Sequence, residues 1–285
     1  MHKPKIVFVI LHYETLSDTK KCIDTLLPCI EGHDCSIIIV DNGSISGRLI
    51  EIQNKYKWNK NIYFIYSKYN LGFAKGNNIG FKYAKYNLNA EIIILSNNDI
   101  VYEQSNMLDL LENKYYNNEF DVAGPRIISL IDNKNQNPVP LLYPSVKSIN
   151  KRLIKYYILY VLSYINADIL VKKLVSKEIL EYRPGSEDDF QLHGACMFFT
   201  RNYIKQYDGL YDDTFMYGEE SILKNLCSQN RFKMAYFDDI YIYHKEGSST
   251  NKIYKKNKDK RQFYYKWNIH SCKLLKKIMK GSSNE

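Results

Sequence analysis

Short apolar runs of strand length recur along the first 130 residues and alternate with segments that have helical spacing. The runs predict strands at 5–11, 36–40, 61–66, 91–95 and 121–128, with helices over 18–30, 44–56, 74–86 and 107–116. Strands that alternate with helices pair in parallel, and the helices cover both faces of the sheet. The pattern therefore predicts an α/β fold with a mostly parallel central sheet.

The alternation breaks after residue 131. A polar stretch rich in Asn and Pro predicts a loop at 132–144, and 148–177 follows as one or two amphipathic helices rich in Tyr, Leu and Lys. A second loop is expected at 181–189. The remaining pattern predicts strands at 194–200 and 233–237, a further strand that ends at His244, a helix over 219–227 and a basic helix over 257–280.

Composition excludes several classes of protein. Of the 285 residues, 45% are hydrophobic and 25% are charged, which is ordinary for a globular protein and excludes wholesale disorder. No apolar stretch reaches the ~18 residues of a membrane-spanning helix, and the first apolar run lacks an Ala-x-Ala-like cleavage site. Without a secretory signal, the six cysteines, which form no Cys-x-x-Cys pair, are expected to be reduced thiols in a cytoplasmic protein.

The net charge of +9 suits anionic partners such as phosphates, acidic lipids or nucleic acid. Residues 245–280 carry many lysines and few acids, so the surplus belongs mainly to the last helix. Basic surfaces rich in aromatic residues bind single-stranded nucleic acid, and the chain has 26 tyrosines. A basic nucleic-acid-binding protein is therefore one hypothesis to be weighed against an enzyme.

Polar clusters follow several strands of the predicted sheet. They are Asp41 to Ser44, Asn70 to Asn78, Ser96 to Asp99, and His244. Ligands of open parallel sheets bind beyond the carboxyl ends of the strands, where these clusters would meet. Each cluster alone is ordinary turn chemistry, but together on one edge they predict a binding site.

The clusters offer chemistry for a nucleotide and a metal ion. Asp41 can accept hydrogen bonds from a base or a ribose. Gly72 and Gly76 are expected to let the backbone approach a diphosphate, beside a helix N-terminus and the charge of Lys75. Asp99 is a hard oxygen ligand suited to Mg²⁺ or Mn²⁺.

Two adjacent carboxylates, Glu219 and Glu220, follow an aromatic run and open a helix. Acidic residues at a helix N-terminus stabilise the helix dipole, which is one interpretation of the pair. The other interpretation is a general base. Burial among aromatic side chains and a neighbouring carboxylate both raise the pKa of a carboxyl group toward neutrality.

Six motifs occur in order along the chain: VDNGS at 40–44, NLGFAKGNNIG at 70–80, LSNND at 95–99, HGACMFF at 193–199, FMYGEE at 215–220 and YHKEGS at 243–248. Over roughly residues 5–250, this order resembles the family-2 glycosyltransferases with the GT-A fold. In particular, it resembles the bacterial rhamnosyltransferase-like enzymes of capsule and O-antigen assembly. The resemblance implies an inverting transferase that uses a nucleotide-diphosphate sugar and a divalent metal.

The resemblance also implies roles for the matching residues. Asp41 matches the contact to the nucleotide base, and the other donor-binding residues are Asn42, Asn70, Gly72, Lys75, Asn78 and Asn98. In the Asp-x-Asp metal motif Asn97 replaces the first acid, which leaves Asp99 as the metal ligand. His244 matches a late histidine near the diphosphate or metal. Glu220 matches the catalytic base, with Glu219 as its rival.

The resemblance completes the expected organisation. Residues 1–131 form the nucleotide-sugar-binding half, 132–190 a loop and amphipathic helical insertion, 191–250 the acceptor and catalytic half, and 251–285 a basic C-terminal helical tail. The donor is expected to be dTDP-rhamnose or a UDP-hexose, and the acceptor a hydroxyl of a growing, lipid-linked cell-surface polysaccharide. Lysine-rich amphipathic helices lie against anionic lipid, so we expect a cytoplasmic enzyme at the inner face of the cell membrane, or a homodimer through the same helices.

Other nucleotide-binding enzymes fit less well. A nucleotidyltransferase that makes sugar nucleotides, or a dinucleotide dehydrogenase, needs a glycine-rich loop after the first strand, where residues 11–15 read LHYET. A catalytically degenerate relative and a nucleic-acid-binding protein remain the alternatives. Acids at strand ends would have no purpose in the latter, so no nucleic-acid partner is expected.

Overall fold

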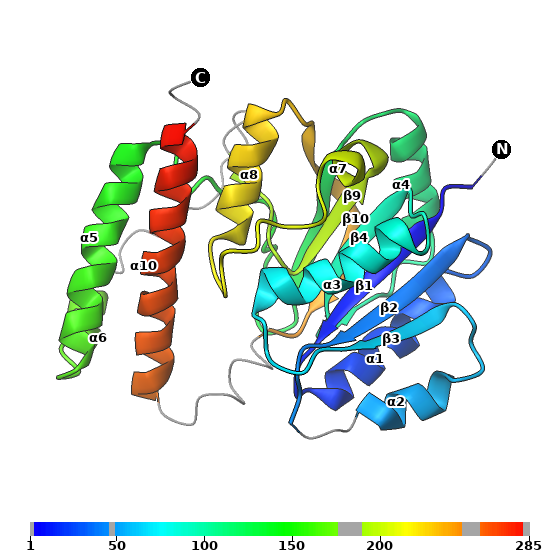
Figure 1. Cartoon of the computed structure of the whole chain (residues 1–285), viewed down its shortest axis with the longest axis horizontal. Helices are drawn as coiled ribbons and strands as arrows, with labels where there is room; N and C mark the ends of the chain where they lie inside the picture. Colours follow the sequence, from blue (N-terminus) through cyan, green and yellow to red (C-terminus); the bar gives the residue numbers. More distant parts are fainter. Residues whose placement is uncertain (1–2, 46–48, 176–189, 247–256, 282–285) are drawn as a thin grey trace.

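The computed structural model describes residues 3–45, 49–175, 190–246 and 257–281. Its centre is an eight-stranded sheet in the order β3-β2-β1-β4-β9-β6-β10-β5, with helices on both faces (Figure 1). A separate pair is formed by β7 and β8. The strands are β1 (Ile6–His12), β2 (Cys35–Asp41), β3 (Ile62–Tyr66), β4 (Ile92–Asn97), β5 (Ile100–Val101), β6 (Val122–Ser129), β7 (Val139–Pro140), β8 (Phe190–Gln191), β9 (Cys196–Thr200) and β10 (Met234–His244).

Most neighbouring strands in the large sheet run parallel. β3, β2, β1 and β4 form one parallel block and β6 and β10 another, whereas β9 is antiparallel to β4 and β6, and β5 is antiparallel to β10. Strands β1, β2, β4 and β9 are buried along nearly their whole length, as expected for strands covered on both faces. The predicted mostly parallel α/β sheet is confirmed.

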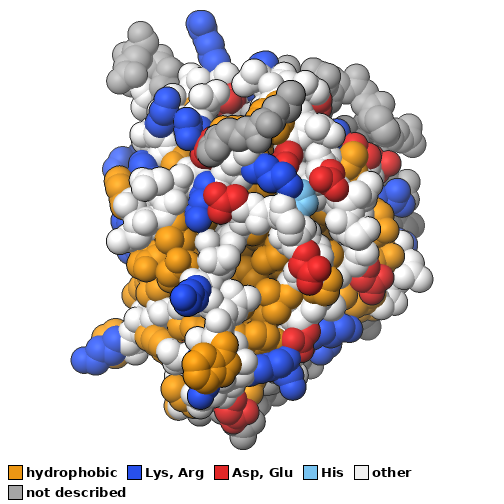
Figure 2. Space-filling view, turned by 90° about the vertical axis from the view of Figure 1, so that its right-hand side faces the viewer, with side chains coloured by type: hydrophobic (Ala, Val, Ile, Leu, Met, Phe, Trp, Pro, Cys, Tyr) orange, Lys and Arg blue, Asp and Glu red, His pale blue; other side chains and the backbone are white. Residues whose placement is uncertain are grey.

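The described helices cover the two faces of the sheet or form a layer beside it. They are α1 (Leu16–Cys29), α2 (Leu49–Tyr56), α3 (Phe73–Tyr86), α4 (Met107–Tyr116), α5 (Val146–Ser163), α6 (Asp168–Val175), α7 (Arg201–Gln206), α8 (Glu219–Gln229) and α10 (Asn257–Gly281). α1, α2 and α4 pack on one face and α3, α7 and α8 on the other. On the side of the N-terminus, acidic and basic side chains are interspersed over the surface (Figure 2).

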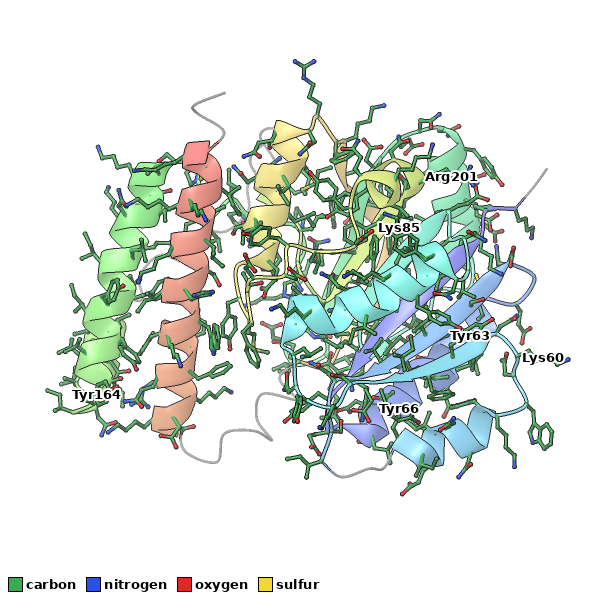
Figure 3. The ribbon with its side chains drawn as sticks, viewed as in Figure 1. Lys60, Tyr63, Tyr66, Lys85, Tyr164 and Arg201 are labelled. Atoms are coloured by element: carbon green, nitrogen blue, oxygen red, sulfur yellow. The ribbon has the colours of Figure 1, made fainter. Side chains whose placement is uncertain are left out.

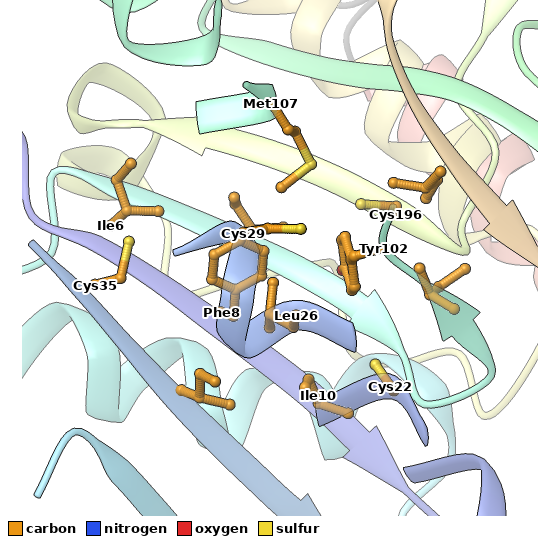
Figure 4. Packing of buried hydrophobic residues seen from close by; sticks show 14 of the residues in the cluster. Ile6, Phe8, Ile10, Cys22, Leu26, Cys29, Cys35, Tyr102, Met107 and Cys196 are labelled. Atoms are coloured by element: carbon orange, nitrogen blue, oxygen red, sulfur yellow. The ribbon is translucent and has the colours of Figure 1, made fainter. Parts of the chain in front are cut away.

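The core beneath α1 is built from aliphatic, aromatic and thiol side chains (Figure 4). Phe8, Ile10 and Leu26 are fully buried there, and burial of each such side chain contributes roughly 1.5–3 kcal/mol. All six cysteines are buried free thiols, as the sequence predicts. Their burial makes them part of the packing.

Several boundaries differ from the sequence-based prediction. α2 begins at Leu49 rather than at Ser44. The two strands expected after residue 232 are a single strand, β10, because a register shift between Phe237 and Tyr241 keeps it paired with β6. β5, α7 and the β7–β8 pair are too short for hydrophobic periodicity to reveal.

The predicted amphipathic insertion and basic tail form a layer of helices beside the sheet (Figures 1 and 3). We call α5, α6 and α10 the helical layer. α5 packs against α10, α6 packs against α5, and α10 also contacts α8. The loop expected at 181–189 lies outside the described residues. None of the described helices is both long enough and apolar enough to cross a bilayer.

Asp168 links α6 to α10 within the helical layer. Its side chain is fully buried. Its carboxylate accepts hydrogen bonds from Arg261 Nε at 2.7 Å and from the Tyr265 hydroxyl at 2.9 Å. A buried carboxylate is tolerated when it is paired and hydrogen-bonded in this way. The contact therefore connects the insertion to the C-terminal helix.

We predict that Asp168→Ala lowers the free energy of unfolding by about 3 kcal/mol, because Arg261 and Tyr265 would lose their acceptor. Urea denaturation followed by circular dichroism measures the change. Asp259→Ala removes an exposed carboxylate in the first turn of α10 and serves as the control. Its loss should stay below about 1 kcal/mol. Equal losses in the two variants would contradict the linking role of Asp168.

Candidate active site

The predicted polar clusters meet at one edge of the sheet. Asp41 at the end of β2 pairs with Tyr66 at the end of β3 (Figure 3), and Asn97 ends β4 on the other side of β1. β10 ends at the same edge with His244, which pairs with Ser129 at the end of the parallel strand β6. Strands that are far apart in the sequence thus end in polar residues at the same edge of the sheet.

Asp99 and His244 form a buried polar corner at this edge, with His244 Nε2 3.2 Å from Asp99 Oδ1. His244 Nδ1 lies 2.8 Å from Gln136 Oε1, which is an acceptor, so Nδ1 carries the proton and Nε2 presents its lone pair. Nε2 forms no hydrogen bond with any group that the structure describes. A lone pair beside a carboxylate oxygen is favourable when a cation, or a second proton on the ring, lies between them.

This corner fits a divalent cation such as Mn²⁺, for which a carboxylate oxygen and an imidazole nitrogen are suitable ligands. Within the described ranges, no group of three or more His, Cys, Asp or Glu side chains could hold a metal ion. A cation here would therefore take its remaining ligands from a bound molecule and from water, as Mg²⁺ usually does.

A cavity of about 480 Å³ lies where the sheet edge, α8 and the helical layer meet. We call it the catalytic cavity. The sheet side contributes Asn97, His193 and Gly194, and the start of α8 contributes Glu219 and Glu220. The helical layer contributes Arg152, Tyr156, Tyr264 and Asn268. Segments from both halves of the chain thus surround the predicted base.

The two carboxylates of α8 differ in their surroundings. Glu219 is buried, and its Oε1 has no hydrogen-bond partner among the described residues. Burial and the charge of Glu220 raise the pKa of Glu219 to about 8. Burial also raises the pKa of Glu220, but backbone N–H groups of Glu220, Gly194 and Gly218 stabilise its charge. Glu220 therefore ionises first, and its charge keeps the proton on Glu219.

Two glycines permit this arrangement. Gly218 precedes α8 with a φ of +91°, a left-handed conformation that glycine adopts without strain. A Cβ atom at Gly194 would lie 2.5 Å from Glu220 Oε1. A larger residue at position 194 would therefore displace the carboxylate.

His193 lies between the carboxylates and the polar corner. It lines the catalytic cavity, and its ring meets that of His244 edge-on, with 5.7 Å between centroids. Its Nδ1 accepts a hydrogen bond from the Ala195 N–H at 3.2 Å, so Nε2 carries the proton. Burial and the nearby His244 lower the pKa of His193 to about 4. It is therefore a neutral hydrogen-bond donor at physiological pH.

Comparison with known proteins agrees with this geometry. The family model described as glycosyl transferase family 2 matches residues 7–206. The chain belongs to glycosyl transferase family 2. No curated protein matches the sequence.

Solved structures share the GT-A fold of this chain. S. aureus TarS 1–349 in complex with UDP-GlcNAc aligns with a TM-score of 0.55 and 14% identity, over 95% of this chain and 66% of that chain. The mannosyltransferase PcManGT from Pyrobaculum calidifontis, in complex with GDP-Man and Mn²⁺, aligns with a TM-score of 0.56 and 10% identity, over 99% and 74%. Against another structure of TarS 1–349, this chain spans 60% of the length.

Asn42 and Asn70, which were expected at the nucleotide, hold the loop before α3. Asn42 Nδ2 donates to Gly72 O at 3.0 Å, and Asn42 Oδ1 accepts from Leu71 N at 3.0 Å. Asn70 Oδ1 accepts from Gly72 N at 2.9 Å. These contacts support a positioning role for both side chains.

The structure shows a reason for glycine at positions 72 and 76 that differs from the predicted approach of the backbone to a diphosphate. A Cβ atom at Gly72 would lie 2.1 Å from Phe215 O, and one at Gly76 would lie 2.7 Å from Leu11 Cδ1. Both glycines therefore allow protein segments to pack closely. The Phe73 N–H at the start of α3 also donates to Phe215 O, at 2.8 Å, rather than being left for an anion.

Asn78 and Asn98 are buried anchors. Asn78 exchanges two hydrogen bonds with the backbone of Leu210, at 2.7 Å and 2.8 Å. Asn98 Nδ2 donates to the hydroxyl groups of Thr15 at 2.6 Å and Thr19 at 2.7 Å. Because protein partners engage these amides, the structure supports positioning rather than the direct donor binding expected from the sequence.

Asp41 and Lys75 lie outside the catalytic cavity. Asp41 is buried, and its Oδ1 accepts the Ser44 N–H at 2.9 Å. Lys75 is exposed in the first turn of α3. Their contacts with a nucleotide stay predictions.

Sequence reasoning assigns no role to His193, Arg152 or Gln136. His193 directly precedes a buried strand, which is a weak local signal for a strand-end site. Arg152 is one of many cations in the amphipathic insertion, and only folding brings it to the catalytic cavity. Gln136 lies in a predicted loop, and its role depends on the distant His244.

Asn78→Ala should lower the free energy of unfolding by about 2–3 kcal/mol, because the buried backbone groups of Leu210 would lose their partners. Urea denaturation measures this loss, and nucleotide affinity of the folded variant should be unchanged. Lys75→Ala should behave in the opposite way, with unchanged stability and weaker nucleotide binding. Wild-type stability in Asn78→Ala would contradict the anchoring role.

Glu219 should make the stability of the protein depend on pH. A carboxyl group whose pKa rises on folding binds more protons in the folded state than in the unfolded state. The free energy of unfolding therefore falls as pH rises from the unfolded pKa of 4.5 toward the folded value of about 8. Glu219→Gln should remove this fall, so the variant should be more stable than wild type at pH 8 in urea denaturation. A variant no more stable than wild type at pH 8 would contradict a protonated, buried Glu219.

Proposed function

We propose that this protein is an inverting glycosyltransferase that transfers a sugar from a nucleotide-diphosphate donor, dTDP-rhamnose or a UDP-hexose, to an acceptor hydroxyl. The observation that carries the proposal is a cavity lined by two carboxylates of raised pKa beside the Asp99–His244 corner. Family membership supports sugar transfer, and the similar structures contain UDP-GlcNAc and GDP-Man. A rhamnosyl donor and a capsule or O-antigen product rest on the resemblance of the sequence motifs.

Glu220 is the proposed base. It is half-buried, whereas Glu219 is buried, and backbone N–H groups stabilise its charge. The acceptor hydroxyl gives its proton to Glu220 while its oxygen attacks the anomeric carbon from the face opposite the diphosphate. One displacement inverts the configuration and requires one carboxylate on the acceptor side.

The donor would lie along the sheet edge, with Asp41 at the base or ribose and Lys75 near the diphosphate. His193 would donate its Nε2 proton to an oxygen of the sugar or the diphosphate. Asp99 and His244 would hold a divalent cation, Mg²⁺ or Mn²⁺. That cation, when bound, stabilises the negative charge of the departing diphosphate.

The acceptor is proposed to be a growing, lipid-linked cell-surface polysaccharide. The lysine-rich helical layer would rest on the inner face of the cell membrane in a cytoplasmic protein, or pair with a second copy. In this division, 1–131 binds the donor and 191–250 serves the acceptor and the chemistry. The insertion 132–190 and the tail 251–285 would make the contact with lipid.

Two features argue against the alternative functions. Burial raises the pKa of Glu220 at the wall of the catalytic cavity, which suits a general base and gives no advantage to a protein without base chemistry. On the face shown in Figure 2, cations and acids are interspersed, and that face lacks the gathered cations of a nucleic-acid-binding surface.

Thermal unfolding tests the donor site. UDP, dTDP, GDP and CMP are each added with and without Mn²⁺ or Mg²⁺. A nucleotide at ~100 times its Kd adds ~2.7 kcal/mol, which raises the Tm by several degrees. We expect one nucleotide to give this shift, and metal to enlarge it in wild type but not in Asp99→Ala or His244→Ala. A shift without metal dependence would contradict the roles of Asp99 and His244, and no shift with any nucleotide would contradict the donor site.

Glu220→Gln should reduce turnover by about 10³-fold, because the acceptor hydroxyl would lose its base. Release of nucleoside diphosphate from the donor identified above measures turnover. Glu219→Gln is the matched control and should retain most turnover, because a protonated glutamate and a glutamine are both neutral. The wild-type kcat/KM should rise with pH, since the raised pKa of Glu220 keeps the base protonated at low pH. A larger loss in Glu219→Gln would reverse the assignment.

A further inference from the structure

A second and larger cavity lies within the helical layer. It is a groove of about 800 Å³ between α5, α6 and α10, which we call the helical groove. It shares Arg152, Tyr156, Tyr217 and Tyr264 with the catalytic cavity. The helical groove therefore adjoins the space in front of Glu220.

Apolar side chains form much of the groove wall. They include Ile154, Ile158 and Leu159 of α5 and Val171 of α6. Ile154 and Ile158 are 60% and 51% exposed, and the apolar surface continues along the outside of α5 and α6. The further exposed side chains are Val161, Tyr164, Ile165, Ile169 and Leu170. An apolar surface this long marks a site that another molecule covers.

The groove is also strongly basic. Its described lining includes three lysines and two arginines and no carboxylate: Lys151, Arg152, Lys155, Lys260 and Arg261. Asp168 neutralises Arg261. Among the described residues, no carboxylate forms an ion pair with Arg152, which is half-buried with its guanidinium 5.2 Å from the ring centroid of Tyr143. An arginine that has no ion pair with a described carboxylate, at the junction of two cavities, is suited to a phosphate group.

We infer that the helical groove binds the lipid part of the acceptor, a long hydrocarbon chain that ends in a phosphate or diphosphate. The chain lies on Ile154 and Ile158, and the phosphate pairs with Arg152. The sugar beyond the phosphate then extends into the catalytic cavity toward Glu220. This inference rests on the proposed transferase function, and it adds the site where the acceptor is held.

Charge and shape favour this occupant over two others. A free oligosaccharide would gain little from isoleucine walls. A second copy of the chain would place the same cations opposite one another across a two-fold axis, which is unfavourable without carboxylates between them. An anionic amphiphile satisfies both the apolar walls and the basic lining.

Isothermal titration calorimetry on the full chain tests the groove with farnesyl phosphate, farnesol and inorganic phosphate. Farnesyl phosphate should bind more tightly than either of its parts. Arg152→Gln should lower the affinity for farnesyl phosphate about tenfold or more and leave the affinity for farnesol unchanged, because only the charged head group contacts the guanidinium. The double variant Ile154→Gln with Ile158→Gln should lower the affinity for both farnesyl phosphate and farnesol.

Lys147→Gln and Ile50→Gln are control variants, since both residues are exposed and line neither cavity. Both control variants should bind farnesyl phosphate and farnesol with the affinities of the wild-type protein. Unchanged farnesyl phosphate affinity in Arg152→Gln, or inorganic phosphate binding as tightly as farnesyl phosphate, would overturn the inference. A dimer in sedimentation velocity that dissociates in the double isoleucine variant, without amphiphile binding, would also overturn it.

The experiments can contradict the lipid site in the groove and the transferase function independently of each other. A nucleotide-dependent Tm shift without amphiphile binding overturns the groove assignment alone. Amphiphile binding through Arg152 without any nucleotide shift keeps the lipid site and contradicts the proposed function.

Discussion

Two adjacent carboxylates at the start of α8, the buried Glu219 and the half-buried Glu220, constrain the rest of the site. A buried charge must be stabilised by hydrogen bonds or be removed by protonation. Both solutions occur here, since backbone N–H groups stabilise Glu220 and Glu219 keeps its proton. The arrangement requires glycine at positions 194 and 218. It also requires the helical layer, whose Tyr264 and Asn268 close the catalytic cavity opposite the sheet.

The helical layer joins two segments that are far apart in the sequence. Asp168 of the insertion binds Arg261 and Tyr265 of the last helix. Apolar side chains of the insertion and of the last helix share a core with α8. Glu220 on α8 and the basic groove between α5, α6 and α10 are therefore parts of one packed unit. In the proposed function, this unit holds the acceptor while the sheet edge holds the donor.

The sheet and its functional edge could be predicted from the sequence because their signals are local. An apolar run that ends in polar residues identifies a strand end, and the structure places Asp41 and His244 at strand ends and Asp99 just after one. Roles that depend on distant partners could not be predicted. Asn78 binds a backbone segment 132 residues away, and Arg152 reaches the cavity only when α5 packs on α10. Local periodicity shows on which face of a helix or strand a side chain lies, but not which distant segment packs against that face.

The most direct test of this account is anomalous diffraction from crystals grown with Mn²⁺ and the nucleoside diphosphate that stabilises the protein. We expect a manganese peak within bonding distance of Asp99 and His244, with the diphosphate beside it and its open side facing Glu220. A manganese peak away from this corner, or a diphosphate held in the helical groove, would contradict the assignment of donor and acceptor sides.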